Sequence, residues 1–392
     1  MKTRLFSLAF LSLSLIIVLV SCNKEPDVTE QYMRGGNSLV VAPDGNVVVA
    51  GYTSSGTKGY EALLIKANAS NGDTLWTKKF GNPYSDAFYS IKNAHKGGFV
   101  AAGFSNRANG SSPSMLVVIT DANGNAVKTK TYGGSAYSQA FSVEPAADSG
   151  YVVAGYIQKT STSDRDIYLI KINNASDTLW TRSIGAKSTN QNDSVNDAAF
   201  GVVAAADGGY FLTGTLNGYT SNGGRIFLMK VSSTGHQLWT KTYAMGIGFS
   251  LTLTGDNGIA ISGSLQEGSS QDIILIKTDA DGNLLWKKTY GGTGYEYGAS
   301  LVETSDGGFA ISGITDSKGF GLEDVYLIRT NSSGDSQWEK TYGGADIDQG
   351  FGLVKMPDNG FCITGLSNTD GSYIFLNRTS SDGSQGWAKY IQ

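Results

Sequence analysis

Short runs in which apolar and polar residues alternate recur along most of the chain. In residues 299–342, four such runs are separated by polar or glycine-bearing segments: Ala299–Glu303, Phe309–Gly313, Asp324–Arg329 and Gln337–Tyr342. Runs of this length with a period of two, bounded by Gly, Asn, Asp and Ser, are typical of β-strands. The pattern therefore predicts an antiparallel meander of four strands.

The meander pattern occurs seven times in the chain. The copies align on the glycine that ends the second run, which is Gly51, Gly103, Gly155, Gly214, Gly263, Gly313 and Gly365, at spacings of 49 to 59 residues. They also align on one position of the fourth run, which holds Trp76, Lys128, Trp180, Trp239, Trp286, Trp338 and Trp387 and therefore all six tryptophans. Two landmarks that keep step over a period of this length indicate a repeat architecture.

One four-stranded sheet cannot bury both of its faces, whereas seven sheets arranged radially can. The sequence therefore predicts an all-β fold, a seven-bladed β-propeller of four-stranded antiparallel blades, over residues 35–392. We expect the repeats at about 36–83, 84–134, 135–186, 187–245, 246–292, 293–344 and 345–392. The tryptophans are expected to fill the gaps between neighbouring sheets, because each ring buries a large apolar surface.

The N-terminal residues form a separate segment. Lys2 and Arg4 precede the apolar run Leu5–Val20. A basic head followed by a short apolar core is typical of an export signal, which we expect in residues 1–21. The motif Leu-Val-Ser-Cys ends at Cys22 and resembles the lipobox of bacterial lipoproteins. An ordinary signal peptide and an uncleaved anchor are the alternatives.

The lipobox resemblance implies that Cys22 is a lipid-modified N-terminus, that residues 22–34 are a tether, and that the acyl chains contact the membrane. It implies a lipid-anchored protein at the bacterial outer membrane, on the cell surface or on the periplasmic face. With Cys22 lipidated, only Cys362 remains. We therefore expect no internal disulfide and a buried, inert thiol at Cys362.

The repeats resemble the tandem β-propeller repeats of bacterial secreted proteins. The motifs that carry the resemblance are DGGFAISG at 306–313 and DVYLIRTNSSGDSQWEKTYGG at 324–344. The Gly-x-x-x-Trp element from Gly282 to Trp286 is also similar to the repeats of pyrroloquinoline-quinone-type propellers. Outer-membrane assembly lipoproteins of that type hold other proteins and have no cofactor. Since the adjacent cysteine pair of the quinone enzymes is absent, the resemblance implies a protein without a cofactor.

Charge and histidine content narrow the functional classes. The net charge is −4 and no long run of Lys or Arg occurs, which argues against nucleic acid binding. The two histidines, His95 and His236, lie in predicted turns of different repeats. We therefore expect neither a Ser-His-Asp triad nor a metal site built from histidines.

The hairpins from first to second and from third to fourth strand are short and alike, whereas the loops from second to third strand and the connections between repeats vary in length and chemistry. The connections between repeats are the candidate site, because variable loops on a rigid scaffold commonly carry function. In a propeller these connections ring the mouth of the central channel. They carry aromatic and acidic residues that we expect to bind a protein partner or a glycan: Tyr84, Asp86, Tyr137, Asp193, Asp197, Tyr295, Glu296, Tyr297, Asp346 and Asp348. A solvated rim without a ligand is the alternative.

The sequence thus favours a non-enzymatic binding or scaffold lipoprotein at the bacterial outer membrane, which uses the loops of a β-propeller. A carbohydrate-active enzyme is a second possibility, because a pair of carboxylates on the loops is sufficient for glycoside hydrolysis. A structural repeat protein of the cell envelope without a discrete site is a third. The residues do not identify the ligand.

Overall fold

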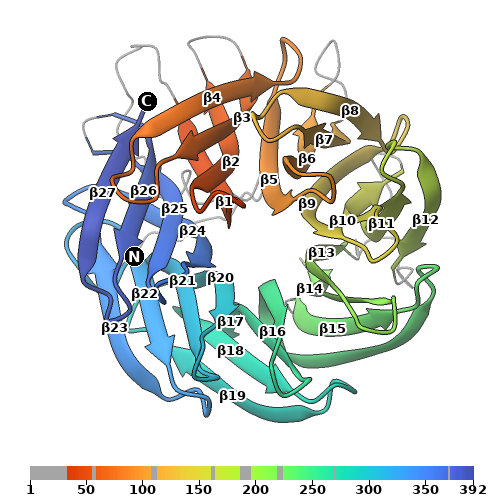
Figure 1. The fold of residues 1–392 in the computed structure, drawn as a ribbon. Coiled ribbons are helices and arrows are strands. Elements are labelled where there is room, and N and C mark those ends of the chain that lie inside the picture. Colours follow the sequence, from red (N-terminus) through yellow and green to blue (C-terminus); the bar gives the residue numbers. More distant parts are fainter. Residues whose placement is uncertain are drawn as a thin grey trace, which may run out of the picture.

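The computed structural model of the protein describes most of the chain after residue 32. The described residues are 33–54, 59–106, 113–159, 164–185, 196–218, 224–267, 270–369 and 371–392. They form antiparallel strands and contain no helix (Figure 1). The signal peptide in residues 1–21, the lipidated Cys22 and the candidate site residue Asp193 lie outside the described residues, so they stay predictions.

Five of the six sheets have four strands that follow one another in chain order. Their bounds are β1 (Arg34–Val41), β2 (Val47–Ser54), β3 (Tyr60–Ala67), β4 (Thr74–Phe80); β5 (Asp86–Asn93), β6 (Phe99–Ser105), β7 (Ser114–Thr120), β8 (Ala126–Tyr132); β9 (Tyr137–Pro145), β10 (Tyr151–Gln158), β11 (Asp166–Ile172), β12 (Thr178–Ile184); β20 (Glu296–Glu303), β21 (Phe309–Thr315), β22 (Asp324–Thr330), β23 (Ser336–Tyr342); and β24 (Asp348–Lys355), β25 (Phe361–Ser367), β26 (Tyr373–Thr379), β27 (Gln385–Ile391).

The sixth sheet has seven strands, so the prediction of seven separate four-stranded sheets is wrong in this part of the chain. Its strands are β13 (Asn196–Ala204), β14 (Tyr210–Gly218), β15 (Arg225–Val231), β16 (Gln237–Leu253), β17 (Ile259–Glu267), β18 (Ser270–Thr278) and β19 (Leu284–Tyr290). The long strand β16 pairs with β15 through Gln237–Met245 and with β17 through Gly246–Leu253.

A short connection between the fourth and fifth repeats explains the merged sheet. Phe249 follows Tyr243 by six positions, whereas Ala299 follows the equivalent Tyr290 by nine. With three residues fewer and no Gly-Gly pair after the tyrosine, the chain continues as one strand from one repeat into the next. The seven sequence repeats are therefore distributed over six sheets.

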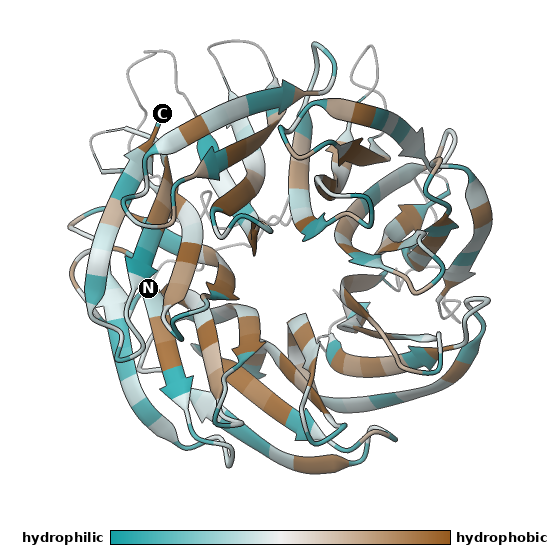
Figure 2. Cartoon of the chain, viewed as in Figure 1, coloured by the Kyte–Doolittle hydropathy of each residue, from teal (hydrophilic) through white to brown (hydrophobic). Residues whose placement is uncertain are grey.

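The sheets form a ring, with the first strand of each repeat nearest the centre and the fourth at the periphery (Figure 1). Apolar residues gather on the inner strands, and the turns are polar (Figure 2). Seven clusters of buried apolar side chains each join two consecutive repeats. One of them brings Val49 and Leu63 of the first repeat against Ile374 and Leu376 of the last, which closes the ring.

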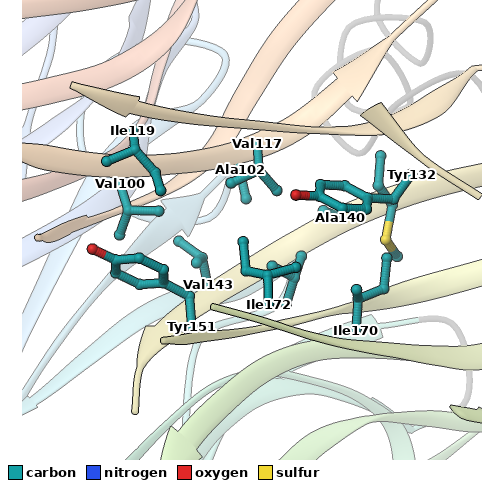
Figure 3. Close-up of a cluster of buried hydrophobic side chains, with 12 residues drawn as sticks. Val100, Ala102, Val117, Ile119, Tyr132, Ala140, Val143, Tyr151, Ile170 and Ile172 are labelled. Atoms are coloured by element: carbon teal, nitrogen blue, oxygen red, sulfur yellow. The ribbon is translucent and has the colours of Figure 1, made fainter. Parts of the chain in front are cut away.

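Figure 3 shows one of these clusters, between the second and third repeats. Val100, Val117 and Ile119 come from the second repeat and face Tyr151 and Ile172 of the third. Rows of side chains from two repeats pack against each other in this way at each junction. The cores of this protein therefore lie between repeats, and a single repeat has no core of its own.

The glycine that ends the second run of each repeat lies opposite a β-bulge. In every first strand, the pairing register with the second strand skips a residue at this level: Asn37, Tyr89, Phe141, Phe200, Phe249, Ala299 and Phe351. Strand β13 has a second irregularity between Asn196 and Ala198. A Cβ atom on Gly155 would lie 1.9 Å from the carbonyl oxygen of Gln139, and the other six glycines meet first-strand carbonyl oxygens at 1.7 to 2.1 Å. Only glycine permits this close approach of the two strands.

Each tryptophan packs on a glycine in the turn before the fourth strand of the following repeat. The pairs are Trp76 with Gly124, Trp180 with Gly235, Trp239 with Gly282, Trp286 with Gly334, Trp338 with Gly383 and Trp387 with Gly72. A Cβ atom on any of these glycines would lie 2.6 to 2.9 Å from a ring atom, and all six have φ between 75° and 80°. Glycine is required here both by the backbone conformation and by the ring above it.

The tyrosine and lysine of the fourth strand bind the same turn. The Tyr290 hydroxyl donates to the carbonyl oxygen of Gly334 at 2.5 Å, and Lys288 Nζ donates to Asp335 Oδ1 at 2.9 Å. Tyr132, Tyr243 and Tyr342 make the same hydrogen bond to the next repeat. The Trp-x-Lys-x-Tyr sequence, which is complete in the fourth, fifth and sixth repeats, thus adds contacts with the next repeat at the outer strand.

A second recurring pair joins the first turn of a repeat to its third strand. The pairs are Asp44–Lys66, Asp148–Lys171, Asp207–Lys230, Asp256–Lys277, Asp306–Arg329 and Asp358–Arg378. The basic side chain is between 3% and 11% exposed and lies across the ladder from the tryptophan, as Arg329 does from Trp338. Each buried cation is therefore neutralised by an aspartate at the rim of the sheet.

The second repeat departs from this arrangement at three positions. It has Lys96 in place of the aspartate, Ile119 in place of the basic residue and Lys128 in place of the tryptophan. The turn of the next repeat has Ser176 where the others have glycine, at φ 68°. Without a tryptophan ring above it, this turn can hold a side chain.

We expect the Trp286→Ala variant to lose about 2–3 kcal/mol of unfolding free energy, because the ring is half-buried against Gly334. Lys128→Ala at the equivalent position of the second repeat is the matched control, and its change should stay within about 0.5 kcal/mol. Urea unfolding followed by circular dichroism measures both. Equal losses in the two variants would contradict the assigned role of the ring.

A double-mutant cycle tests the dependence of tryptophan on glycine. Lys128→Trp alone should destabilise the protein, because the ring would meet the Cβ atom of Ser176. Ser176→Gly removes that atom, so the double variant should be more stable than the sum of the single changes, with a coupling of about 1 kcal/mol or more. Additive changes in the unfolding free energy would show that the two positions do not depend on each other.

The aspartates of the buried pairs predict a loss of stability in acid. The Thr304 hydroxyl, which donates to the carboxylate, and the Arg329 guanidinium lower the pKa of Asp306 to about 2. A carboxyl with a lowered folded-state pKa stabilises the fold above its ordinary pKa of 3.8, and this stabilisation disappears as the pH falls through the folded value. The urea midpoints of wild type and Asp306→Asn should therefore differ at about pH 5 and converge toward about pH 2. A difference that stays constant over this range would contradict the assignment.

Candidate functional site

One side of the ring carries all the connections of variable length. Because the strands are antiparallel and consecutive, the turns from first to second and from third to fourth strand lie on one side. The connections from second to third strand and from one repeat to the next lie on the other. We call this second side the loop face. The sequence-predicted site residues that the structure describes lie in its connections or at the starts of the first strands that follow them.

The predicted carboxylates at the starts of the first strands are buried and hydrogen-bonded to backbone. Asp86, Glu296 and Asp348 are 0% exposed, and Asp197 is 1% exposed. Asp86 accepts a bond from the amide of Asn82 at 2.8 Å, Glu296 from Gly292 at 3.0 Å and Asp348 from Gly344 at 2.7 Å. These side chains hold the connections between repeats in place, so they are not open to a ligand.

The predicted aromatic residues have two different environments. Tyr84 and Tyr295 are 40% and 43% exposed, and Asp346 is also exposed. Tyr297 is half-buried, and its burial, with the nearby Glu323 carboxylate, raises its pKa to about 12. The structure thus places Tyr295 in the connection before β20, Tyr297 in β20 and Asp346 in the connection before β24. Tyr84 lies in another part of the ring.

Reasoning from the sequence missed a set of aromatic rings on the innermost strands. They are residues at the β-bulges of four consecutive repeats, and we call Tyr89, Phe141, Phe200 and Phe249 the inner aromatic cluster. The ring centroids of Tyr89 and Phe141 are 5.4 Å apart, those of Phe141 and Phe200 4.8 Å, and those of Phe200 and Phe249 5.6 Å. Three of the rings are half-buried, and Phe200 is 8% exposed.

The inner aromatic cluster continues to the loop face through the third repeat. The ring of Tyr156 lies 5.8 Å from Phe141 and 5.9 Å from Tyr137, which it stacks on. The Arg165 guanidinium is 4.8 Å from the centroid of Tyr156 and 5.8 Å from that of Tyr137. Burial raises the pKa of Tyr156 well above its ordinary value, so the ring stays neutral beside the cation.

A signal for this cluster is present in the sequence once the repeats are stacked on one another. The position of the first-strand run that the structure shows as the bulge is aromatic in five of the seven repeats, with Asn37 and Ala299 as the exceptions. A bulge interrupts the alternation of inward and outward residues, so a strict period of two does not reveal these side chains. The cluster therefore requires the structure for its recognition.

His95, His236 and Cys362 lie in three different repeats. His95 and His236 are exposed turn residues, and His95 Nε2 lies 3.1 Å from the carbonyl oxygen of Gly150. Cys362 is buried as expected, and burial raises the pKa of its thiol to about 12. Within the described ranges, no three His, Cys, Asp or Glu residues are grouped to hold a metal ion. What the inner cluster offers is stacking and apolar contact.

Solved structures of Sqt1 from Chaetomium thermophilum are similar to this chain. The structure of Sqt1 bound to the N-terminus of the ribosomal protein L10 has 11% sequence identity and a TM-score of 0.52, and the match covers 93% of this chain and 88% of that chain. A second Sqt1 structure has 11% identity and a TM-score of 0.51, over 91% and 85% of the two chains. The sequence matches no protein-family model and no curated protein.

These comparisons contradict the outer-membrane location that the lipobox resemblance implied. The similar structures are of eukaryotic proteins, which points away from a bacterial outer-membrane lipoprotein. That location is therefore not retained. In the part of the chain that the structure covers, no helix has the length and apolar character needed to cross a membrane.

At these sequence identities, the likeness to Sqt1 concerns the fold. It agrees with the closed ring of antiparallel sheets and with the repeats seen in the sequence. The chain has the fold of a β-propeller repeat protein.

Proposed function

We propose that this protein is a non-enzymatic scaffold that binds a segment of a partner protein on the loop face and inner strands of the propeller. The observation that carries the proposal is the inner aromatic cluster, in which four rings touch across four consecutive repeats. Aromatic rings are over-represented at the centres of protein interfaces, because they bury a large area with few rotatable bonds.

The position of Arg165 supports a protein ligand. Its guanidinium lies over Tyr156 and Tyr137, where the cluster reaches the loop face. Arginine and tyrosine together are the residue types most enriched among strong interface contacts. The likeness in fold to Sqt1, which was solved bound to a ribosomal protein segment, is consistent with the same use of a propeller.

The rigidity of the ring also favours binding. Tryptophan, tyrosine and lysine of one repeat hold the turn of the next, so the inner strands have a fixed spacing. A preformed surface loses little entropy when a partner docks. The carboxylates that a glycosidase would use, such as Asp348 and Glu296, instead hold backbone amides in place.

The test selects ligands from a random peptide library displayed on phage, with the full chain as target. Peptides that bind the wild type should bind Phe249→Ala at least about tenfold more weakly, since loss of one central ring removes a major contact. Leu179→Ala is the matched control, because Leu179 is 53% exposed on the outer strand β12. Thermal unfolding of each variant shows that the fold is retained.

Two results would count against this function. Enriched peptides that bind wild type and Phe249→Ala with equal affinity would remove the inner aromatic cluster from the binding site. Binding of oligosaccharides on a glycan array, with no peptide enriched, would assign the face to sugars instead of proteins.

A further inference from the structure

The connection between β21 and β22 exposes the most accessible large apolar side chain of the described residues. We call residues 316–323 the Phe320 loop. Phe320 is 82% exposed and Leu322 is 57% exposed. Exposed apolar surface that is rimmed by polar residues is typical of interaction sites.

The Phe320 loop is held by hydrogen bonds on all sides. The amide of Phe320 donates to Asp324 Oδ2 at 2.6 Å. Lys318 Nζ donates to the Tyr326 hydroxyl at 2.6 Å and to Glu339 Oε2 at 2.5 Å. The Ser317 hydroxyl donates to the buried Glu296 carboxylate. The exposed phenylalanine is therefore presented on a fixed backbone, which lowers the entropy lost when a partner covers it.

Two neighbouring connections enlarge the surface around the loop. On one side, the amide of Tyr295 donates to Asp316 Oδ1 at 2.6 Å. On the other side, the amide of Asp348 donates to the carbonyl oxygen of Glu323 at 2.8 Å, which holds the connection that contains Asp346 against the loop. Tyr295, 43% exposed, therefore lies on a connection that is hydrogen-bonded to the Phe320 loop.

The charge of the Phe320 loop and of the connection beside it is negative. Asp316 and Asp346 are exposed, and Glu323 is half-buried beside Gln349. None of the three carboxylates forms an ion pair with a lysine or arginine of the described residues. The one lysine of the loop, Lys318, is already paired with Glu339. A partner must therefore bring both an apolar group and positive charge.

We propose that the Phe320 loop, together with Tyr295 and Asp346, is a docking surface for a basic protein segment that carries an exposed apolar side chain between lysines or arginines. The inference rests on the proposed function, because it names the chemistry of a protein ligand on the same face. A second copy of this surface would oppose carboxylate to carboxylate, and an anionic lipid surface would be repelled in the same way. Charge complementarity thus favours a basic segment.

The test uses three synthetic peptides of equal length and the full chain. The first alternates leucine and lysine, the second replaces lysine by glutamate, and the third replaces leucine by serine. Fluorescence anisotropy of labelled peptides should show binding of the leucine–lysine peptide only. The double variant Phe320→Ser/Leu322→Ser should bind it at least about tenfold more weakly. Leu284→Ser/Leu285→Ser is the matched control, because these leucines are 47% and 55% exposed on the outer strand β19.

Salt and charge variants test the electrostatic part. Raising NaCl from about 50 to about 300 mM should weaken binding to the wild type, since exposed charges are screened at the higher ionic strength. The Asp316→Asn/Asp346→Asn variant should bind more weakly at low salt and show a smaller salt dependence. The asparagine at position 316 keeps the oxygen that accepts from Tyr295, so the loop is retained.

Each contrary result overturns the inference in a distinct way. Equal binding of the lysine and glutamate peptides, or unchanged binding by the Phe320→Ser/Leu322→Ser variant, would refute this docking surface. If the Phe249→Ala variant alone no longer bound the leucine–lysine peptide, the binding site would be the inner aromatic cluster, and the proposed function would be retained. Self-association of the wild type that the Phe320→Ser/Leu322→Ser variant abolishes, seen by analytical ultracentrifugation, would assign the surface to a second copy of the chain.

Discussion

The contact between a tryptophan ring and a left-handed glycine of the next repeat is the interaction on which the ring depends. A repeat of this protein has no core of its own, so its stability comes from the faces that it shares with its neighbours. At six of the seven shared faces the tryptophan packs on the outer edge, where the ring and the positive φ together require glycine. Where the second repeat lacks the tryptophan, the aspartate and the buried cation are missing as well, and Ser176 stands in place of glycine. In the other repeats the members of this set contact one another: the basic residue pairs with the aspartate and lies across the ladder from the tryptophan, and the tryptophan ring covers the glycine of the next repeat. The loss of one member therefore removes a contact of another.

The contacts between repeats and the candidate site use different strands, which explains why the candidate site lies on the inner strands. The outer strands supply the contacts between repeats, and the glycine of the second strand admits a bulge in the first. The ladder skips a bulged residue, so its side chain is not needed for sheet pairing. Phe141 and Phe249 can therefore form a surface of contacting rings without loss of the fold.

The fold was largely predictable from the sequence, because the period of the repeats, the strand pattern and the tryptophan position all reflect packing that every repeat shares. The merged sheet was not predictable, although the three-residue deficit after Tyr243 was visible, because a connection of that length can either turn or continue as a strand.

The site was less predictable than the fold. Asp86, Glu296 and Asp348 look like free acids in the sequence, yet each accepts a hydrogen bond from an amide four residues earlier. Whether a carboxylate on a connection faces solvent or its own backbone is decided by the local chain path, which the residue types do not specify.

Two surfaces of different chemistry share one rigid face. The inner aromatic cluster spans the second to fifth repeats, and the Phe320 loop with its carboxylates belongs to the sixth. A single partner with two segments would bind the second site as an intramolecular event once the first is occupied, so two weak contacts would give a tight complex. This gain requires that the distance between the sites does not change. The contacts between Trp286 and Gly334 and between Trp239 and Gly282 lie in the repeats that join the two surfaces. The packing that closes the ring is therefore also what would let one partner use both sites at once.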